Sequence, residues 1–452
     1  MAIRRTAQRM LARSAASPAA RAGARGLASA SRSDQCIALE EKYNAHNYQP
    51  LPVVLERGMG SSVWDVDGVE YTDFLSAYSS MNQGHCHPRI IAALKEQADK
   101  LTLASRAFYT ERLGRYAKFL TTTFGYDRVL PMNTGVEGGE TAIKMARRWA
   151  YDVKGVPANE AVVLFAKNNF WGRTLAAVSS STDPSSSGGF GPFMPGFDTI
   201  DYGSIAALEE AITRHGSDRV AAFMVEPIQG EAGVVVPPEG YLREAKRVCE
   251  AHNVLLIADE VQTGLGRTGR MLCSDWDEVK PDIVILGKAL SGGVLPASAV
   301  LGSDEVVLSI KRGQHGSTFG GNPLACAVAE EAVRVLIDEK LPARADKLGA
   351  VFRSQMQEMV EPEGAGGSVE SVRGRGLLNA VTVRPGTHKA TGKPFSAWDV
   401  CLRLAKDARV LAKPTHQNII RFSPPLMIAE ETLDSSIAAI KDVLAAVRSE
   451  CE

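Results

Sequence analysis

A lysine and an aspartate that follow two short apolar runs are the residues of this chain best suited to covalent chemistry. The runs cover residues 254–257 and 283–286, and polar or Gly-rich segments bound each of them, as is typical of buried parallel strands. The first run leads to Asp259 and the second to Lys288. Because ligands bind at the carboxyl ends of the strands in an open α/β sheet, we expect these side chains to meet at one edge.

An amine and a carboxylate at one sheet edge suit a pyridoxal 5'-phosphate site. The amine of Lys288 can condense with the aldehyde of this cofactor, and the carboxylate of Asp259 can keep its pyridine nitrogen protonated, so that the ring accepts electrons. On spacing alone, an Asp and a Lys at strand ends are more often solvated or paired with each other. Further motifs must therefore decide between a cofactor site and a pair of ordinary charges.

A strand, a turn and a helix N-terminus follow one another near the middle of the first half of the chain, and together they predict an anion site. Residues 129–132 read as a short strand, the next three as an Asn-Thr-Gly turn, and residues 136–151 as an amphipathic helix. Free backbone N–H groups and the helix dipole converge at such a helix end. We assign the cofactor phosphate to Thr134, Gly135 and Val136, with an ordinary turn as the alternative.

Two glycines stand early in this predicted helix, where a bulkier helix former is commoner. Each of Gly138 and Gly139 weakens a helix by roughly 1 kcal/mol relative to alanine. Close approach of another backbone segment would explain both of them.

The elements that carry these residues predict an α/β fold in two domains. Helices alternate with strands up to about Val335, which is typical of a mostly parallel, doubly wound sheet flanked by helices. We expect residues 81–335 to form this large cofactor-binding domain. Residues 34–80, which read as short strands of a small antiparallel sheet, and residues 336–452 should together form a smaller α+β domain that covers the cleft.

Length and composition exclude several classes of protein. A chain of 452 residues exceeds one compact domain, and a formal net charge of −1 argues against nucleic acid or an anionic membrane as a partner. No apolar run reaches the length of a spanning helix. The seven cysteines are odd in number and lack a CxxC pair, which is typical of reduced thiols in an intracellular compartment and indicates no metal site.

The first 33 residues differ in composition from the rest. They are rich in Ala and Ser and contain no acidic residue before Asp34, which is typical of a transit peptide. Arginine richness favours the mitochondrial matrix over a plastid, and a merely disordered basic tail is the alternative. The arginines of this segment are Arg4, Arg5, Arg9, Arg13, Arg21, Arg25 and Arg32.

One motif has the letters of a nicotinamide site without its context. Residues 264–269 read GLGRTG and match GxGxxG, yet the following residues are a poor helix and no ribose-binding strand end appears. A dinucleotide site requires a strand, a turn and a helix in that order. We therefore assign no nicotinamide cofactor to this stretch.

Five separated motifs resemble the class III, ω-amino-acid branch of the pyridoxal-phosphate-dependent aminotransferases. They keep their order, and the resemblance runs from about Tyr43 to Pro425. It implies a fold-type I structure and a transaminase. The motifs are NTGV at 133–136, NFWGR at 169–173, EPIQGE at 226–231, the stretch 254–291 around Asp259 and Lys288, and STFGGN at 317–322.

The resemblance also implies further contacts with the cofactor. Phe170 and Val261 are expected on the two faces of its ring, and Gln262 against its phenolic oxygen. Thr318, with Ser317 beside it, matches a loop that crosses the dimer interface and completes the phosphate pocket of the partner subunit. A homodimer with shared active sites is therefore expected, and assembly beyond the dimer stays open.

The substrates implied are small molecules, with L-ornithine as the amino donor and 2-oxoglutarate as the acceptor. Arg173 and Arg421 would grip the two carboxylates of the diacid, and Glu231 would cover Arg421 while the donor is bound. Tyr48 and Tyr78 match positions that line the substrate channel, and Tyr48 would receive the α-amino group of ornithine. The product, glutamate-5-semialdehyde, cyclises to pyrroline-5-carboxylate.

Several alternatives remain. Within the branch, N-acetylornithine or 4-aminobutyrate could be the donor. An aminomutase or a decarboxylase on the same fold would need no keto-acid acceptor. A binding relative that has lost its catalytic lysine is disfavoured because Lys288 is in place.

Overall fold

The computed structural model describes residues 31–361, 367–390, 392–416 and 418–450, and the chain divides into two compact units. Residues 1–57 and 63–70 belong to the first unit, and residues 58–62 and 71–452 to the second. Nearly all of the predicted transit peptide lies outside the described residues. Among the helices that are described, none is long and apolar enough to cross a membrane.

The first unit contains a helix that the sequence pattern did not predict. Helix α2 (Arg32–Tyr43) begins with a capping box, in which Ser31 and Asp34 each bond the other's backbone N–H. An ion pair of 2.7 Å joins Arg32 to Glu56 within the unit. Strand β2 (Ser62–Asp65) lies almost wholly in this unit, and β1 (Leu55–Met59) begins in it.

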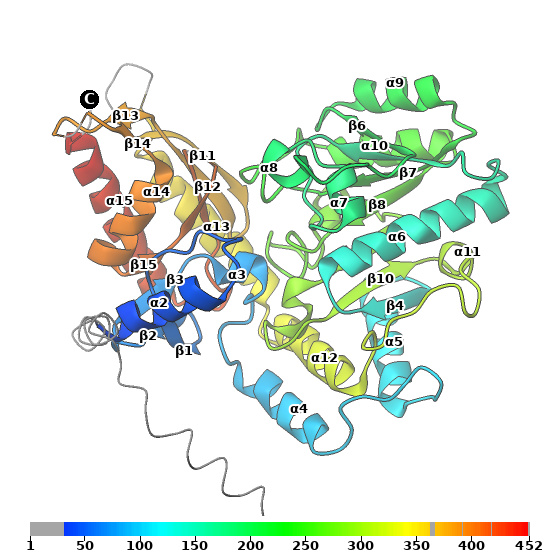
Figure 1. Ribbon diagram of the computed structural model, residues 1–452, viewed down its shortest axis with the longest axis horizontal. Helices are drawn as coiled ribbons and strands as arrows, with labels where there is room; N and C mark the ends of the chain where they lie inside the picture. Colours follow the sequence, from blue (N-terminus) through cyan, green and yellow to red (C-terminus); the bar gives the residue numbers. More distant parts are fainter. Residues whose placement is uncertain (1–30, 362–366, 391, 417, 451–452) are drawn as a thin grey trace, which may run out of the picture. The chain divides into compact units, whose positions relative to one another are not determined.

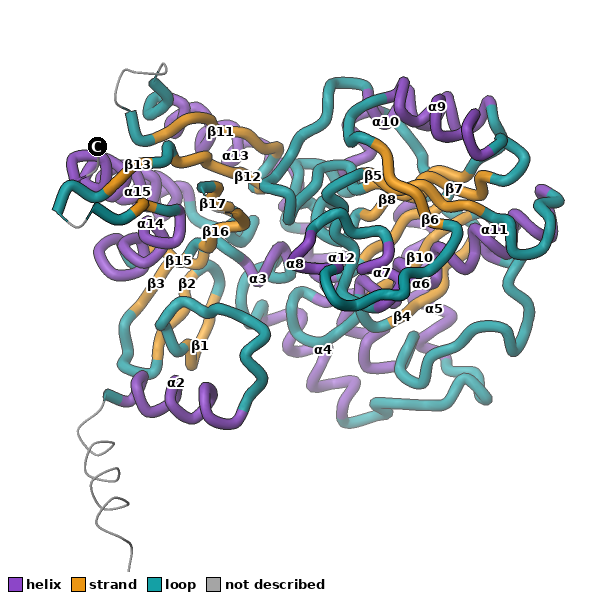
Figure 2. Tube along the Cα trace, turned by 45° about the horizontal axis from the view of Figure 1, so that its top comes forward, coloured by secondary structure: helices purple, strands orange, loops and turns teal. Residues whose placement is uncertain are grey.

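A seven-stranded sheet forms the centre of the second unit (Figure 2). Neighbouring strands are parallel from β9 to β6, whereas β10 runs antiparallel to both β9 and β4. The mostly parallel α/β sheet expected from the sequence is therefore confirmed. In sheet order the strands are β4 (Arg128–Met132), β10 (Ser298–Gly302), β9 (Ile283–Leu286), β8 (Leu255–Asp259), β7 (Val220–Val225), β5 (Val162–Ala166) and β6 (Phe197–Ile200).

Helices cover both faces of this sheet, and alternate residues of its central strands pack against the helices of one face or the other. On one face, Val163 and Phe165 pack with the apolar side of α6 (Gly135–Trp149). On the other face, Leu164 packs with α9 (Ile205–His215) and α10 (Tyr241–Ala251). Because both faces are covered, strands β5, β7 and β9 are apolar along their whole length, which is why such strands read as short uninterrupted runs.

Three further helices lie side by side although they are far apart in sequence (Figure 1). Helix α12 (Pro323–Asp338) packs on α4 (Pro88–Ala98) and α5 (Glu111–Phe124). It also contacts η3 (Lys288–Ser291), the short 3₁₀ turn that follows β9. The segment that carries Lys288 therefore rests on a buried helix.

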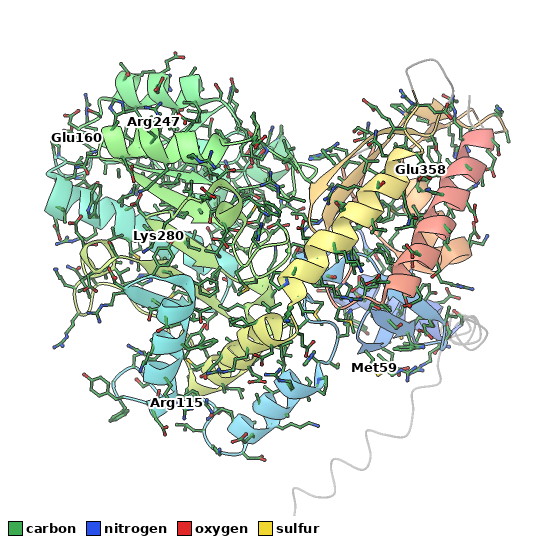
Figure 3. The ribbon with its side chains drawn as sticks, turned by 180° about the vertical axis from the view of Figure 1, so that it is seen from behind. Met59, Arg115, Glu160, Arg247, Lys280 and Glu358 are labelled. Atoms are coloured by element: carbon green, nitrogen blue, oxygen red, sulfur yellow. The ribbon has the colours of Figure 1, made fainter. Side chains whose placement is uncertain are left out.

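The C-terminal part of the second unit is a four-stranded antiparallel sheet with helices. Arg421 lies on an inner strand of this sheet, opposite Ala380 and Lys413. Figure 3 shows Glu358 at the end of α13, where an ion pair of 2.7 Å joins it to Lys441 of α15. The strands are β11 (Val369–Arg375), β12 (Leu378–Val383), β17 (Ile419–Phe422) and β16 (Lys413–His416), and the helices are α13 (Leu341–Gln357), α14 (Ala397–Arg403), η4 (Leu404–Ala408) and α15 (Glu430–Glu450).

The remaining elements are short. Strand β3 pairs in parallel with β15, with Thr72 opposite Val410, a long-range pairing that the predicted antiparallel sheet did not include. Residues 180–196 are mostly irregular and hold one helical turn. The short elements are β3 (Glu70–Asp73), α3 (Ser76–Ser79), η1 (Ala150–Lys154), α7 (Leu175–Ser179), α8 (Pro184–Ser187), η2 (Cys273–Asp277), α11 (Asp304–Val307), β13 (Gly386–Thr387), β14 (Pro394–Phe395) and β15 (Val410–Leu411).

Candidate active site

Asp259 and Lys288 end up at the carboxyl edges of neighbouring parallel strands. Asp259 is the last residue of β8 and pairs in register with Ile285 of β9, three residues before Lys288. The backbone of Lys288 is left-handed, with φ of 46°, which is rare for a residue with a long side chain. The charge of Lys288 lowers the pKa of Asp259 and the charge of Asp259 raises that of Lys288, so the two charges lie close enough to interact.

Both groups have shifted pKa values with the same principal cause. Burial, and then the charge of Arg421, lower the pKa of Lys288 from 10.5 to about 8. Burial also raises the pKa of Asp259 from 3.8 to about 6, although a hydrogen bond from Val261 and the charge of Lys288 oppose this rise. The lysine is thus poised to be a neutral nucleophile close to neutral pH.

Both side chains keep a polar group that is available to a ligand. Among the described residues, the amine of Lys288 has no hydrogen-bond or ion-pair partner. The carboxylate of Asp259 accepts one hydrogen bond, of 3.0 Å from the N–H of Val261, and this leaves its other oxygen for a ligand. An amine ready for an aldehyde and a carboxylate ready for a pyridinium N–H are what pyridoxal phosphate requires.

The N-terminus of α6 supplies donors for a phosphate. The N–H groups of Gly135 and Val136 belong to the first turn, which has no intrahelical acceptors. Thr134 is the N-cap, and its hydroxyl accepts from the N–H of Glu137 while its own N–H donates to the Glu137 carboxylate at 2.8 Å. Asn133 links this helix end to Ser317 at 2.9 Å. The structure therefore brings four of the predicted phosphate residues together.

The two glycines of α6 permit close packing behind this phosphate site. A Cβ on Gly138 would lie 2.7 Å from the side chain of Ile285 on β9, and one on Gly139 would lie 2.5 Å from Trp171. The sequence left the reason for these glycines open, with approach of another backbone segment as one explanation, and the neighbours in the structure are side chains. Their bulk holds α6 against β9 and so fixes the helix end relative to the strand that precedes Lys288.

Arg421 is the centre of a buried polar cluster that sequence spacing could not show. Its side chain is 1% exposed, and its guanidinium lies 3.1 Å from the carboxylate of Glu231. It also donates to the Gln262 amide oxygen at 2.6 Å and to the Ser79 hydroxyl at 3.4 Å. Gln262 in turn donates to Glu231 at 3.1 Å. Glu231 and Gln262 therefore cover Arg421 from two sides.

A strained turn delivers two residues to this cluster. All four residues of α3 have left-handed backbones, with φ of 50°, 46°, 59° and 71° from Ser76 to Ser79. Left-handed conformations cost roughly 1–2 kcal/mol per residue for side chains other than glycine. The carboxylate of Asp73 holds the turn by accepting from the N–H groups of Leu75 and Ser76. The turn places the ring of Tyr78 5.5 Å from the guanidinium of Arg421.

Glu226 is a site residue to which sequence reasoning gave no role. It follows β7 directly and is buried, and its carboxylate accepts from the N–H groups of Phe170 at 2.9 Å and Gly230 at 3.3 Å. Burial, and then the charge of Asp259, raise the pKa of Glu226 to about 8. The signal was present, because an acidic residue at the end of an apolar strand is the pattern that led to Asp259.

The other predicted substrate and interface residues are more exposed. Arg173 is exposed, and its guanidinium lies 5.5 Å from the ring centre of Phe170. Thr318 is exposed and has no polar partner within the described parts of the chain. Tyr48 belongs to the first unit, where it is 76% exposed.

A cavity adjoins this cluster in the second unit. Its volume is ≈ 470 Å³, and both Phe170 and Glu231 line it, together with the half-buried Tyr202. Lys167 and Asp201 on its wall form an ion pair of 2.7 Å. The described residues hold no group of His, Cys, Asp or Glu side chains that could bind a metal ion.

Comparison with known proteins places the chain in a family. The family model described as aminotransferase class-III, whose members depend on pyridoxal phosphate, matches residues 43–444. A mitochondrial ornithine aminotransferase of Drosophila melanogaster is 57% identical over 417 residues, which are 92% of this chain and 93% of that protein.

Two solved structures resemble the fold closely. The ornithine aminotransferase of Toxoplasma gondii, crystallised with oxidised glutathione and with partial occupancy of pyridoxal phosphate, has a TM-score of 0.88 and 50% identity, covering 95% of this chain and 98% of its own. The acetylornithine aminotransferase of Elizabethkingia anophelis has a TM-score of 0.82 and 50% identity, and the match covers 92% of this chain and 100% of that chain. From the family match and the 57% identity to a relative over most of the chain, we conclude that this protein belongs to the class-III aminotransferases.

Proposed function

We propose that this protein transfers the δ-amino group of L-ornithine to 2-oxoglutarate, in two half-reactions at one site. The products are glutamate-5-semialdehyde, which cyclises to pyrroline-5-carboxylate, and glutamate. The observation that carries the proposal is the ion pair between Glu231 and the buried Arg421, because it can alternate between a covered and an open carboxylate-binding group. The 57% identity to an ornithine aminotransferase supports the same conclusion.

The chain's own residues account for cofactor binding. Thr134, Gly135 and Val136 would hold the phosphate, Asp259 the ring nitrogen, and Phe170 and Val261 the two ring faces. Gln262 would turn toward the phenolic oxygen when it is not bonded to Arg421. When bound, pyridoxal phosphate supplies an electron sink for the carbon that carries the substrate amine.

Lys288 is the residue that moves the proton. Its amine lies at a buried edge and its pKa is lowered to about 8, so a large fraction is neutral near pH 8 and able to act as a base. It would take the proton from the δ-carbon of ornithine and donate it to the C4′ carbon of the cofactor. Asp259 would keep its negative charge against the ring N–H throughout.

Glu231 and Arg421 would decide which substrate enters. While Glu231 covers Arg421, a donor with a positively charged amine meets no bare cation. When a diacid enters, Glu231 would move away, and Arg421 and Arg173 would each bind one carboxylate, because a guanidinium fork matches carboxylate geometry. For ornithine, family resemblance supports Arg173 as the receptor of the α-carboxylate, with Tyr48 and Tyr78 lining the channel.

We also propose the assembly and location implied by the family. Thr318 would complete the phosphate pocket of a partner subunit in a homodimer, which agrees with its exposure and lack of a polar partner within the described residues. Residues 81–335 would form the large domain, and residues 34–80 with 336–452 the small one. The N-terminal 33 residues would direct the chain to the mitochondrial matrix, and fusion of residues 1–33 to a reporter tests this.

A second candidate donor is N-acetylornithine, because an acetylornithine aminotransferase is 50% identical to this chain. The deciding experiment measures kcat/KM for ornithine, N-acetylornithine and 4-aminobutyrate with 2-oxoglutarate as acceptor. We expect ornithine to be the best donor. A preference for N-acetylornithine or 4-aminobutyrate would refute the proposal, and turnover without 2-oxoglutarate would indicate an aminomutase or a decarboxylase.

A further inference from the structure

Arg267 and Arg421 are the two bulkiest fully buried side chains among the described residues, and Arg267 belongs to the GLGRTG stretch, to which we assign no dinucleotide. Its guanidinium donates to the carbonyl oxygens of Leu377 at 2.9 Å and Pro424 at 2.7 Å. It also donates twice to the side-chain oxygen of Asn82, at 3.1 and 2.6 Å. Within the described chain, no carboxylate lies within ion-pair distance of Arg267, although burying a lone cation is costly.

The acceptors of Arg267 lie close in sequence to the residues that surround Arg421. Asn82 comes three residues after Ser79, and Pro424 comes three residues after Arg421. Arg267 itself follows Gln262 by five residues. One guanidinium therefore joins the three segments that deliver Ser79, Gln262 and Arg421 to the substrate-recognition cluster.

Additional contacts show that these segments are fitted to one another. The side-chain NH₂ of Asn82 donates to the backbone carbonyl of Leu265 at 2.9 Å. The backbone carbonyl of Asn82 accepts from the N–H of Leu426 at 2.8 Å. Gly266 has a φ of 87°, and a Cβ there would lie 3.0 Å from Leu426. Gly266 thus allows the loop that carries Arg267 to pack closely against the segment that follows Pro424, which gives this glycine a packing role.

We propose that Arg267 is a positioning residue for substrate recognition, which sets Ser79 and Gln262 against Arg421 by tying their three segments together. This inference rests on the proposed function, because it takes Arg421 to be the group that binds a carboxylate of the diacid. A planar fork with several N–H groups can serve three acceptors in fixed directions, whereas a lysine ammonium carries three donors on a flexible stem. Arg267→Lys should therefore remove some of the hydrogen bonds that hold the three segments together, while it retains the positive charge at this position.

Arg267→Lys should affect the two half-reactions to different extents. The diacid half-reaction requires Arg421 to bind substrate in a fixed position, and a displacement of about 1 Å can cost up to about a hundredfold in rate. In the ornithine half-reaction, Glu231 covers Arg421, so the position of Arg421 matters less. We expect kcat/KM for 2-oxoglutarate to fall about tenfold or more, and kcat/KM for ornithine to fall less than about threefold.

The experiment measures each half-reaction of the holoenzyme in single turnovers, from the visible absorbance of the bound cofactor, together with thermal unfolding. Asn82→Ala is the second variant, since it removes two of the hydrogen bonds and retains Arg267. Arg147→Lys is the control, because Arg147 is a half-buried arginine that likewise donates to a carbonyl, that of Pro195 at 2.8 Å, on another part of the molecule. The control should lower stability without changing the ratio of the two half-reactions.

A selective loss of the diacid half-reaction in Arg267→Lys or in Asn82→Ala, absent from Arg147→Lys, supports the inference. Equal losses in both half-reactions, or the same ratio as in the control, overturn it. If Arg267→Lys does not fold, the Asn82→Ala result alone decides in the same way. Failure of the proposed function is separate, because the unsubstituted protein would then prefer another donor to ornithine or turn over without 2-oxoglutarate.

Discussion

The guanidinium of Arg421 and the carboxylate of Glu231 lie 3.1 Å apart, although 190 positions separate them in the sequence. Arg421 is almost fully buried, whereas the side chain of Glu231 is 29% exposed and lines the cavity beside Phe170. The carboxylate is therefore the partner that can move. An ion pair with one fixed and one movable member is suited to a site that must admit an amine and a diacid in turn.

Glu231→Ala should change the balance between the two half-reactions. Removal of the carboxylate leaves the guanidinium of Arg421 without its anionic partner. The uncovered cation would repel an amine donor but would be free to bind a diacid. Truncating one member of a buried charge pair typically costs about 2–5 kcal/mol, so we expect the ornithine half-reaction to slow by at least about tenfold. The glutamate half-reaction should slow much less. Single-turnover rates with ornithine and with glutamate measure this ratio, and an unchanged ratio would count against the switch.

Lys288→Ala should abolish transamination without preventing cofactor binding. The substitution removes both the covalent link and the base, and positioned proton transfer alone contributes about 10²–10⁴-fold in rate. The contacts that we propose for the phosphate at Gly135 and Val136 and for the ring at Asp259 would stay in place, so pyridoxal phosphate should be retained noncovalently. Steady-state assays with ornithine and native mass spectrometry test the two halves of this prediction. Turnover at a normal rate would show that another amine does the chemistry.

The capture of pyridoxal phosphate by the ligand-free protein should depend on pH through Lys288. Only the neutral amine reacts with an aldehyde, and burial with the charge of Arg421 lowers the pKa of Lys288 to about 8. The capture rate should thus rise with pH and level off above about 8. Because the carboxylate of Asp259 raises the pKa of Lys288, Asp259→Asn should move the inflection to lower pH. Stopped-flow absorbance measures the profile, and an inflection near 10.5 in the unsubstituted protein would contradict it.

Gly138→Ala should destabilise the protein, although alanine is the better helix former. The added Cβ would lie 2.7 Å from Ile285, and overpacking a core typically costs about 1–3 kcal/mol. Gly114→Ala is the matched control in another helix, since a Cβ there meets nothing within 4 Å. That control should stabilise the protein by about 0.5–1 kcal/mol. Denaturant unfolding compares the two, and equal effects of both substitutions would refute the packing role of Gly138.

Local sequence signals were sufficient for the elements that bear the cofactor groups. The run at 283–286 is β9 itself, and the strands and the helix around Asp259 and Thr134 were predicted to within a few residues. Elements with weaker patterns were missed. Strand β6 begins after a Pro-Gly pair and contains an aspartate and a threonine, so no apolar run marked it. Helix α2 has no buried residue, so no apolar face marked it either.

The sequence by itself determined the chemical groups and the strand ends that carry them, because apolar runs, turn residues and helix caps act between neighbours along the chain. Only the tertiary structure decided that Arg421, Glu231, Gln262 and Ser79 form one cluster, that Glu226 holds the Phe170 loop, and that Arg267 joins three distant segments. These contacts join residues more than fifty positions apart. Their geometry depends on how sheets and helices pack, and periodicity along a single segment carries no information about that packing.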